Sequence, residues 1–378
     1  MAKRRPSGDG MVRKREDGRW EGRIVIGHKE NGDPIFRYVY ADTQKELTVK
    51  LRQHIDFYQG VDLTERSRMT LGEWRDQWLE DIAGTVRSNT LTRYRGTVDR
   101  HIKPYLGNKP ISQVKGKDIQ RLYETLAKRG NRNTGEGLSS GTVRGIHSML
   151  HEALGAAQQA SIIPRNPTEE IEAPKFGYKP KKVLTDTQMD QFMETVRQDA
   201  VWYDFFYTEL TTGLRRGEIC GLKWEDFDDE AGTLKVRRSI HEEKGGKLTS
   251  WDTKTAAGTR TILLPPSTVE LLRERKKSAL TDWIFHNPLK PEQPTRPSAA
   301  YERTKVLLKQ AGRPDLRFHD LRHTFATLAL QNGVDVKTLS SMLGHYSAGF
   351  TLDTYTHATM KMQIEAADKL GGFMAQSF

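Results

Sequence analysis

The chain of 378 residues contains a single cysteine, and this scarcity excludes two kinds of protein. One thiol cannot build an internal disulfide framework, and it cannot supply a metal site made from several cysteines. Cys220 itself stands among apolar residues, between Ile219 and Leu222. We therefore expect it to be a small residue of the core.

Long apolar runs are also missing from the chain. No run reaches the roughly 18 residues of a membrane-spanning helix, so no membrane partner is expected. The first residues, Met-Ala-Lys-Arg-Arg, are not followed by the apolar stretch of a secretory signal. These absences predict a cytoplasmic protein.

Positive charge is what the chain has in excess. It carries 60 lysines and arginines against 49 acidic residues, a formal net charge of +11, and its pI is near 9.5. Such a balance is typical of proteins that bind a polyanion, most simply nucleic acid. A merely solvated basic surface is the alternative, and charge alone does not choose between them. The length predicts two or three domains.

Three short motifs rich in histidine, arginine and tyrosine lie close together near the end of the chain. They read His-Asp-Leu-Arg-His at 319–323, Leu-Gly-His at 343–345 and Asp-Thr-Tyr-Thr-His at 353–357. His319 and Arg322 are three residues apart, so on a helix they share one face. A second short helix is predicted to stop at Gly344. His345 would then begin a loop, and Tyr355 would stand at the head of a third helix.

This set of side chains suits an attack on a phosphodiester. Arginine offers a planar fork of donors that fits two phosphate oxygens. Histidines add donors and move protons near neutral pH. A tyrosine hydroxyl, with a pKa of roughly 10, is a poor nucleophile until neighbouring cations stabilise its anion. The design requires no metal and no cofactor. Each residue taken alone has an ordinary structural interpretation, and only their order and spacing favour catalysis.

The three motifs resemble the second half of the active site of tyrosine recombinases, the lambda-type phage integrase family. The first half of the family pattern is an arginine in a Thr-Gly-Leu-Arg context and a lysine in a β-hairpin turn. Both occur upstream, at Arg215 and Lys254. Arg216 is the alternative to Arg215 for the role of catalytic arginine, but the family pattern places this arginine directly after Gly-Leu, which is Arg215. The chain is most similar to integrases of conjugative transposons and temperate phages.

The resemblance implies a role for each catalytic residue. The implied set is Arg215, Lys254, His319, Arg322, His345 and Tyr355. Tyr355 attacks a scissile DNA phosphate, forms a 3′-phosphotyrosyl link and frees a 5′-hydroxyl. The two arginines bind the non-bridging oxygens with help from His345, and Lys254 protonates the leaving oxygen. His319 assists proton transfer at the nucleophile, and Glu218 is expected to be a buried partner that orients the site.

We expect a multidomain fold, mainly α with small antiparallel β-sheets. The predicted parts are a three-stranded sheet plus helix at 1–60, a linker at 61–69, a four-helix core-binding domain at 70–163, a proline-rich linker at 164–182 and a mixed α/β catalytic domain at 183–378 with a C-terminal tail from about residue 360. In the catalytic domain, strands at 234–240 and 259–264 are predicted to pair, with Lys254 in their connection. A helix is predicted at 215–222.

Basic residues outside the catalytic set are candidates for DNA contacts. In the N-terminal sheet they are Lys14, Arg15, Arg19, Arg23 and Arg37, and in the helical domain they are Arg93, Arg95, Arg100, Arg144 and His147. In the family, the first module binds accessory arm sites with its sheet in the major groove, and the second grips the core site. The alternative is a charged face that contacts only water.

The resemblance implies a bacterial site-specific recombinase that integrates and excises a mobile element. Its expected partners are double-stranded DNA at core and arm sites, three further copies in a homotetramer, and an excision or directionality factor. The hinged apolar tail after Gly371-Gly372 would dock on a neighbouring copy or on its own domain. A type IB topoisomerase is the alternative enzyme, and a catalytically silent DNA-binding regulator is the alternative outside enzymes.

Overall fold

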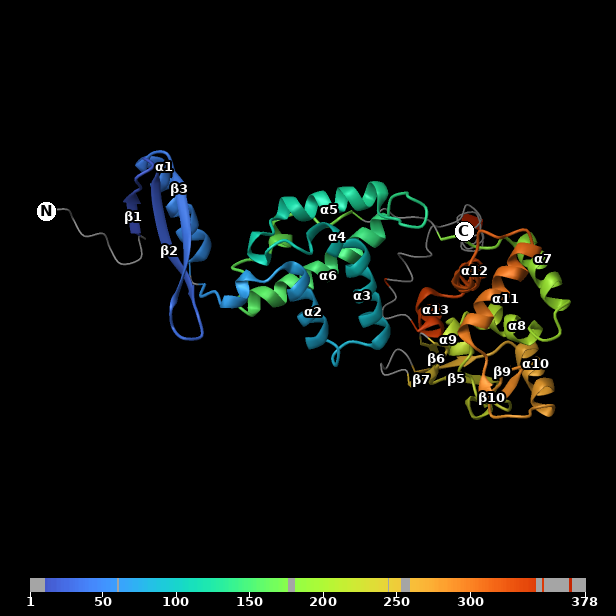
Figure 1. Ribbon diagram of the computed structural model, residues 1–378. Coiled ribbons are helices and arrows are strands. Elements are labelled where there is room, and N and C mark those ends of the chain that lie inside the picture. Colours follow the sequence, from blue (N-terminus) through green and yellow to red (C-terminus); the bar gives the residue numbers. More distant parts are fainter. Residues whose placement is uncertain are drawn as a thin grey trace, which may run out of the picture. The chain divides into compact units, whose positions relative to one another are not determined.

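The computed structural model describes residues 11–59, 61–175, 181–243, 245–252, 259–344, 349 and 367–368. The chain divides into two compact units, Met1–Tyr178 and Lys179–Phe378. The elements are labelled in Figure 1. Within the described ranges, no helix is both long enough and apolar enough to cross a bilayer. The expected fold class, mainly helical with small antiparallel sheets, is confirmed.

The first unit begins with a three-stranded antiparallel sheet backed by a helix (Figure 1, blue). Its elements are β1 (Met11–Lys14), β2 (Trp20–His28), β3 (Pro34–Ala41) and α1 (Gln44–Tyr58). Thr43 caps α1 by accepting a hydrogen bond from the Glu46 amide, as its side chain type favours. Leu47 and Leu51 of α1 are buried against the sheet. A Cβ at Gly22 would lie 2.9 Å from Leu51, so glycine allows this close packing.

The rest of the first unit is helical. It contains α2 (Leu71–Asp81), α3 (Ser88–His101), α4 (Lys103–Leu106), α5 (Gly116–Arg129) and α6 (Ser140–Gln159), with 3₁₀ turns at Glu65–Arg68 and Ile111–Gln113. Thr70 and Glu73 form both halves of a capping box at the start of α2. Trp74 packs in the core and donates its indole N–H to the Ala153 carbonyl at 2.8 Å. The four long helices match the predicted ones, and α4 is an added turn.

The beginning of the proline-rich stretch is not extended. Pro167–Glu170 forms a 3₁₀ turn that packs on α5 and α6. Asn166 is buried and donates its amide to the His151 carbonyl at 2.9 Å, while Thr168 bonds the His151 ring at 2.8 Å. Prolines favour an open chain, but here side-chain hydrogen bonds fold the segment back onto the helices.

The second unit surrounds one large apolar core with helices and short strands. Its helices are α7 (Asp186–Arg197), α8 (Tyr203–Thr212), α9 (Arg216–Ile219), α10 (Pro266–Lys277), α11 (Pro297–Gln310), α12 (Phe318–Gln331) and α13 (Val336–Leu343). Its strands are β4 (Phe227–Asp228), β5 (Thr233–Val236), β6 (Arg238–Glu242), β7 (Leu248–Asp252), β8 (Arg260–Leu263), β9 (His286–Asn287) and β10 (Lys290–Pro294), with a 3₁₀ turn at Trp224–Asp226. Phe192, Phe205 and Phe206 are fully or almost fully buried in the core, and so is Cys220, as predicted.

The predicted pairing of 234–240 with 259–264 is confirmed for the first part of the segment, where β5 pairs with β8 and also with β4. The prediction of one continuous strand is wrong, because β6 pairs with β7 in a separate hairpin. Continued alternation after Leu234 and Val236 would point Arg238 into the core. The chain instead turns at Arg237, and Arg238 forms ion pairs with Glu225 and Asp226. The cost of burying a guanidinium among apolar residues accounts for the break.

Candidate active site

Arg215 is positioned by a sharp turn between α8 and α9. α8 ends at Gly213, which has a φ of +59° and closes the helix in the left-handed conformation. A Cβ at this position would lie 2.4 Å from the Phe325 ring, so only glycine lets the turn pack on α12. Arg215 then becomes the residue that caps α9, and its amide donates to the Glu218 carboxylate at 2.9 Å.

The helix predicted at 215–222 is limited to the four residues of α9. β6 crosses this segment so closely that a Cβ at Gly217 would lie 2.4 Å from the Ser239 hydroxyl. The glycine that permits the crossing also weakens the helix. Arg216, directly after the cap, points elsewhere, and its guanidinium lies 5.4 Å from the centre of the Tyr301 ring.

Glu218 is the buried centre of the site, as predicted. Its residue is 3 % exposed, and its carboxylate lies between Arg215, at 2.7 Å, and Arg260, at 2.8 Å. Burial raises the pKa of the carboxyl, but the hydrogen bonds and charge of Arg260, together with the charge of Arg215, outweigh burial and bring the pKa to about 2. Glu218 is therefore an anion that fixes both guanidinium groups.

Arg322 and His319 come from α12, one turn apart. Arg322 is 1 % exposed, and it donates to the Gly213 carbonyl and to the Leu343 carbonyl, both at 2.7 Å. His319 is accessible at the surface, and its ring meets His323 edge to face at 4.7 Å. Partial burial by its surroundings and the charge of Arg322 lower the pKa of His319 below its ordinary value. At neutral pH the ring is a base that can accept a proton.

Three arginines from three different elements bind the last carbonyls of α13. The bonded pairs are Arg260 Nε to Met342 O at 2.6 Å, Arg322 Nη2 to Leu343 O at 2.7 Å, and Arg215 Nη2 to Gly344 O at 2.9 Å. The final carbonyls of a helix have no partner within it and carry partial negative charge, which cations stabilise. Gly344 closes the helix with a φ of +61°, and His345 is the next residue of the chain.

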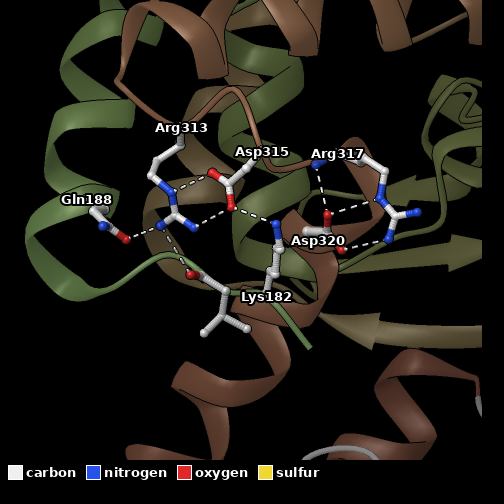
Figure 2. Close-up of polar contacts among 7 residues, drawn as sticks. Lys182, Gln188, Arg313, Asp315, Arg317 and Asp320 are labelled. Atoms are coloured by element: carbon white, nitrogen blue, oxygen red, sulfur yellow. Dashed lines mark hydrogen bonds and ion pairs between the residues drawn. The ribbon is translucent and has the colours of Figure 1, made fainter. Parts of the chain in front are cut away.

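A second polar cluster fixes the loop that leads into α12 (Figure 2). Lys182, at the start of the unit, binds Asp315 at 3.1 Å, and Arg313 binds the same carboxylate at 3.0 Å. Arg317 caps α12 by donating its amide to Asp320 at 2.8 Å. These contacts hold the first described residues of the second unit next to α12, the helix that carries His319.

The structure brings together three of the six predicted catalytic residues. Arg215 caps α9, and His319 and Arg322 lie on α12. Arg215 and Arg322 bind carbonyls at the end of α13, and the charges of both arginines act on His319. Lys254, His345 and Tyr355 lie outside the described residues, as does the predicted tail from residue 360 apart from residues 367 and 368. Within the described part of the chain, no group of three or more His, Cys, Asp or Glu side chains could hold a metal ion.

The N-terminal sheet separates its basic residues onto two faces. Cross-strand partners share a face, and Ile24, the partner of Arg37, packs on the buried side under α1. By the same rule Lys14, the partner of Trp20, belongs to the α1 side. Of the five candidates, Arg15 and Arg23 lie on the open face, and Arg19 lies in the β1–β2 turn, bonded to Asp17.

The open face also carries residues that were not predicted. They are Arg13, Phe36, Tyr38 and Tyr40. Arg23 lies over the Phe36 ring at 4.6 Å and Arg15 lies over the Tyr40 ring at 5.5 Å. Two-residue alternation along β1 and β3 was the available signal, since it puts alternate residues of each strand on one side. We name this open face the β-face.

The helical-domain candidates do not form one surface. Arg93 and Arg100 are two turns apart on α3 and share a side, whereas Arg95 points to the opposite side. Arg144 on α6 is exposed. His147 is half-buried and shares a hydrogen bond of 3.1 Å with the Tyr123 hydroxyl, and burial lowers its pKa. It is thus a poor source of positive charge at neutral pH.

The helical domain of the first unit, together with Arg215 and Arg322 fixed at the end of α13, is the arrangement of the tyrosine recombinase class. The profile of the Phage integrase family matches residues 182–362, and that of the Phage integrase, N-terminal SAM-like domain matches residues 70–127. The chain belongs to the phage integrase family, and it is a tyrosine-type site-specific recombinase. The predicted family and enzyme class are confirmed.

Known relatives match along almost the whole chain. A tyrosine recombinase XerC-like protein of Caldanaerobacter subterraneus subsp. tengcongensis is 28% identical over 375 residues, covering 92% of this chain and 94% of its own. The ICEBs1 integrase of Bacillus subtilis is 25% identical over 377 residues, covering 95% and 98%. These integrase relatives favour a recombinase over the topoisomerase alternative.

Solved structures share the fold. The Tn1549 transposon integrase in complex with a circular intermediate DNA has a TM-score of 0.68 at 23% identity, covering 80% of this chain and 99% of that chain. A lambda integrase tetramer bound to a Holliday junction has a TM-score of 0.57 at 19% identity, covering 91% and 96%.

Proposed function

We propose that this protein is the integrase of a mobile element and that it cuts and rejoins DNA with the six catalytic residues named above. The observation that carries the proposal is the convergence of Arg215 and Arg322 on the end of α13, directly before His345. Two guanidinium groups held in fixed positions are suited to the negative charge that develops on a phosphate under attack.

The proposed chemistry is a transesterification. The Tyr355 oxygen bonds to the scissile phosphorus while the bond from phosphorus to the 5′ oxygen breaks. His319, whose pKa is lowered, accepts the phenolic proton, and Lys254 gives a proton to the leaving oxygen. Arg215, Arg322 and His345 stabilise the non-bridging oxygens. The bond energy is retained in the phosphotyrosyl link, so the reverse reaction rejoins a strand.

The β-face is the proposed site for arm DNA. Guanidinium groups stacked on aromatic rings combine charge for phosphates with flat apolar surface for bases and sugars. Lambda integrase is recorded as a tetramer on a Holliday junction, and we propose that this chain also recombines DNA as a homotetramer. An excision or directionality factor and a bacterial cytoplasmic location complete the proposal.

A nicked suicide half-site from the element's own end tests the enzyme assignment. The wild-type protein should form a covalent adduct that survives denaturation, and Tyr355→Phe should bind the same DNA without forming one, because only the hydroxyl is lost. Adduct at the wild-type level in this variant would contradict the assignment and point to Tyr346 or another hydroxyl. Resolution of a four-way junction by the wild-type protein would separate a recombinase from a topoisomerase.

A further inference from the structure

Arg260 is a buried arginine of β8 for which the catalytic scheme has no role. The residue is 9 % exposed. Its Nη1 and Nη2 atoms donate to the two oxygens of Glu218 at 3.2 and 2.8 Å, and its Nε donates to the Met342 carbonyl at 2.6 Å. One planar group therefore contacts both the carboxylate that orients Arg215 and the end of the helix that leads to His345.

We propose that Arg260 is a positioning residue for strand cleavage, which sets Arg215 through Glu218 and sets the end of α13 through the Met342 carbonyl. Because one planar guanidinium makes both contacts, the positions of Arg215 and of the end of α13 are coupled to each other. This inference rests on the proposed role of Arg215 at the scissile phosphate.

The geometry requires a guanidinium in particular. A carboxylate bound by two parallel N–H groups is fixed in orientation as well as in position. The third donor, Nε, lies in the same plane and reaches the helix end. A lysine would keep the charge, but a single ammonium on a flexible stem cannot hold Glu218 by two oxygens and Met342 at once. Arg260→Lys should therefore preserve the buried charge and lose the alignment.

Among the described residues, Glu218 has one charged contact besides Arg260. This is Arg215, whose side chain is 41 % exposed and which must also bind the proposed phosphate. Without Arg260, the full charge of Glu218 acts on Arg215 alone. We expect Arg215 to be drawn towards Glu218 and away from the phosphate, so the damage should fall on cleavage rather than on DNA affinity.

The experiment compares Arg260→Lys and Arg260→Met with wild-type full-length protein on a nicked half-site from the element's end. Arg197→Met is the matched control, since Arg197 is an exposed arginine of α7 paired only with Glu194 in the described structure. Single-turnover adduct formation and DNA affinity are measured for each variant. We expect Arg260→Met to slow adduct formation by about 10²-fold, the scale of one lost oxyanion donor, and Arg260→Lys to slow it by about 10-fold. DNA affinity should be unchanged.

A second substrate distinguishes positioning from a loss of folded protein. It carries a methylphosphonate at the scissile position, which removes the negative charge that Arg215 is proposed to neutralise. If Arg260 acts through Arg215, the defect should shrink to within about threefold of wild type on this substrate, because the stabilisation that is lost is no longer needed. A partly unfolded variant would be slowed equally on both substrates, and that result would overturn the inference.

The same measurements distinguish a failure of the proposed enzyme function from a failure of the proposed role of Arg260. If wild-type protein forms no adduct on either substrate, the proposed function fails and the role of Arg260 fails with it. If wild type forms the adduct and both Arg260 variants match it, only the positioning role is refuted. A fall in DNA affinity that accounts for the whole defect would also refute it.

Discussion

Arg215 and Arg216 are adjacent in the sequence, but their surroundings predict opposite results when each is changed to lysine. Arg215 holds the Glu218 carboxylate at 2.7 Å and the Gly344 carbonyl at 2.9 Å with two different nitrogens. Lysine can keep one of these bonds but not the fork, so the proposed phosphate donor loses its fixed direction. The cost of one lost preorganised donor is about 2.7–4 kcal/mol, or about 10²–10³-fold in the cleavage rate.

Arg216→Lys should be mild. Arg216 lies over the Tyr301 ring, and a lysine can occupy the same place. A cation over an aromatic ring contributes about 0.5–1 kcal/mol at an exposed site, so even complete loss corresponds to less than about tenfold. The assay is single-turnover adduct formation at saturating DNA, with thermal unfolding of both variants as the control for folding. A slower Arg216→Lys than Arg215→Lys, at equal stability, would refute the assignment of the two positions.

Three further predictions follow from other sites. His319, with its lowered pKa, should be neutral above about pH 6.5, so the loss of cleavage that His319 causes should lie on the acid side of the pH–rate profile. His319→Gln should be slow and lack this acidic fall in rate; an unchanged acidic fall in a pH–rate series would exclude His319 as its source. Glu209 is fully buried, its carboxylate oxygens have no hydrogen-bond partner among the described residues, and burial raises its pKa well above normal. The native state then keeps a proton that the unfolded chain releases above a pH of about 4.5, so this carboxyl lowers the stability of the protein as the pH rises. Glu209→Gln should therefore raise the urea midpoint of unfolding at pH 8 but not at pH 4. An equal change at both pH values would contradict a buried neutral acid. On the β-face, Arg23→Ala should weaken arm-DNA binding and make the slope of log binding constant against log salt concentration shallower by about 0.9. Arg37→Ala, on the side of the sheet that faces α1, should change neither quantity. Equal effects of the two variants in a salt titration would contradict the distinction between the faces.

Helix positions could be predicted because their signals are local. Thr70 with Glu73 and Thr185 with Gln188 mark helix starts by direct capping contacts, and Gly344 marks a helix end. Each signal lies within four residues of the element that it defines, so the sequence shows it without knowledge of the fold.

The sheet and the centre of the site depend on partners far along the chain. The break between β5 and β6 depends on Arg238 meeting Asp226, and the shortness of α9 depends on β6 crossing Gly217. Arg260 is bound to a carboxylate 42 residues before it and a carbonyl 82 residues after it. No residue next to Arg260 in the sequence indicates these contacts. The sequence therefore shows that Arg260 follows Lys254, the proposed proton donor, but it does not show which residues Arg260 binds.

The cluster of Lys182, Arg313 and Asp315 in Figure 2 has a mechanical consequence. Two residues after Lys182, the Leu184 amide donates to the Thr324 hydroxyl at 3.0 Å, so the segment 182–184 is attached both to the loop before α12 and to α12 itself. A pull on the chain at residue 181 would be borne first by these few polar bonds, and only then by the apolar core. A force applied to the chain before residue 182 would therefore act on α12, which carries His319 and Arg322, before it acts on the rest of the second unit.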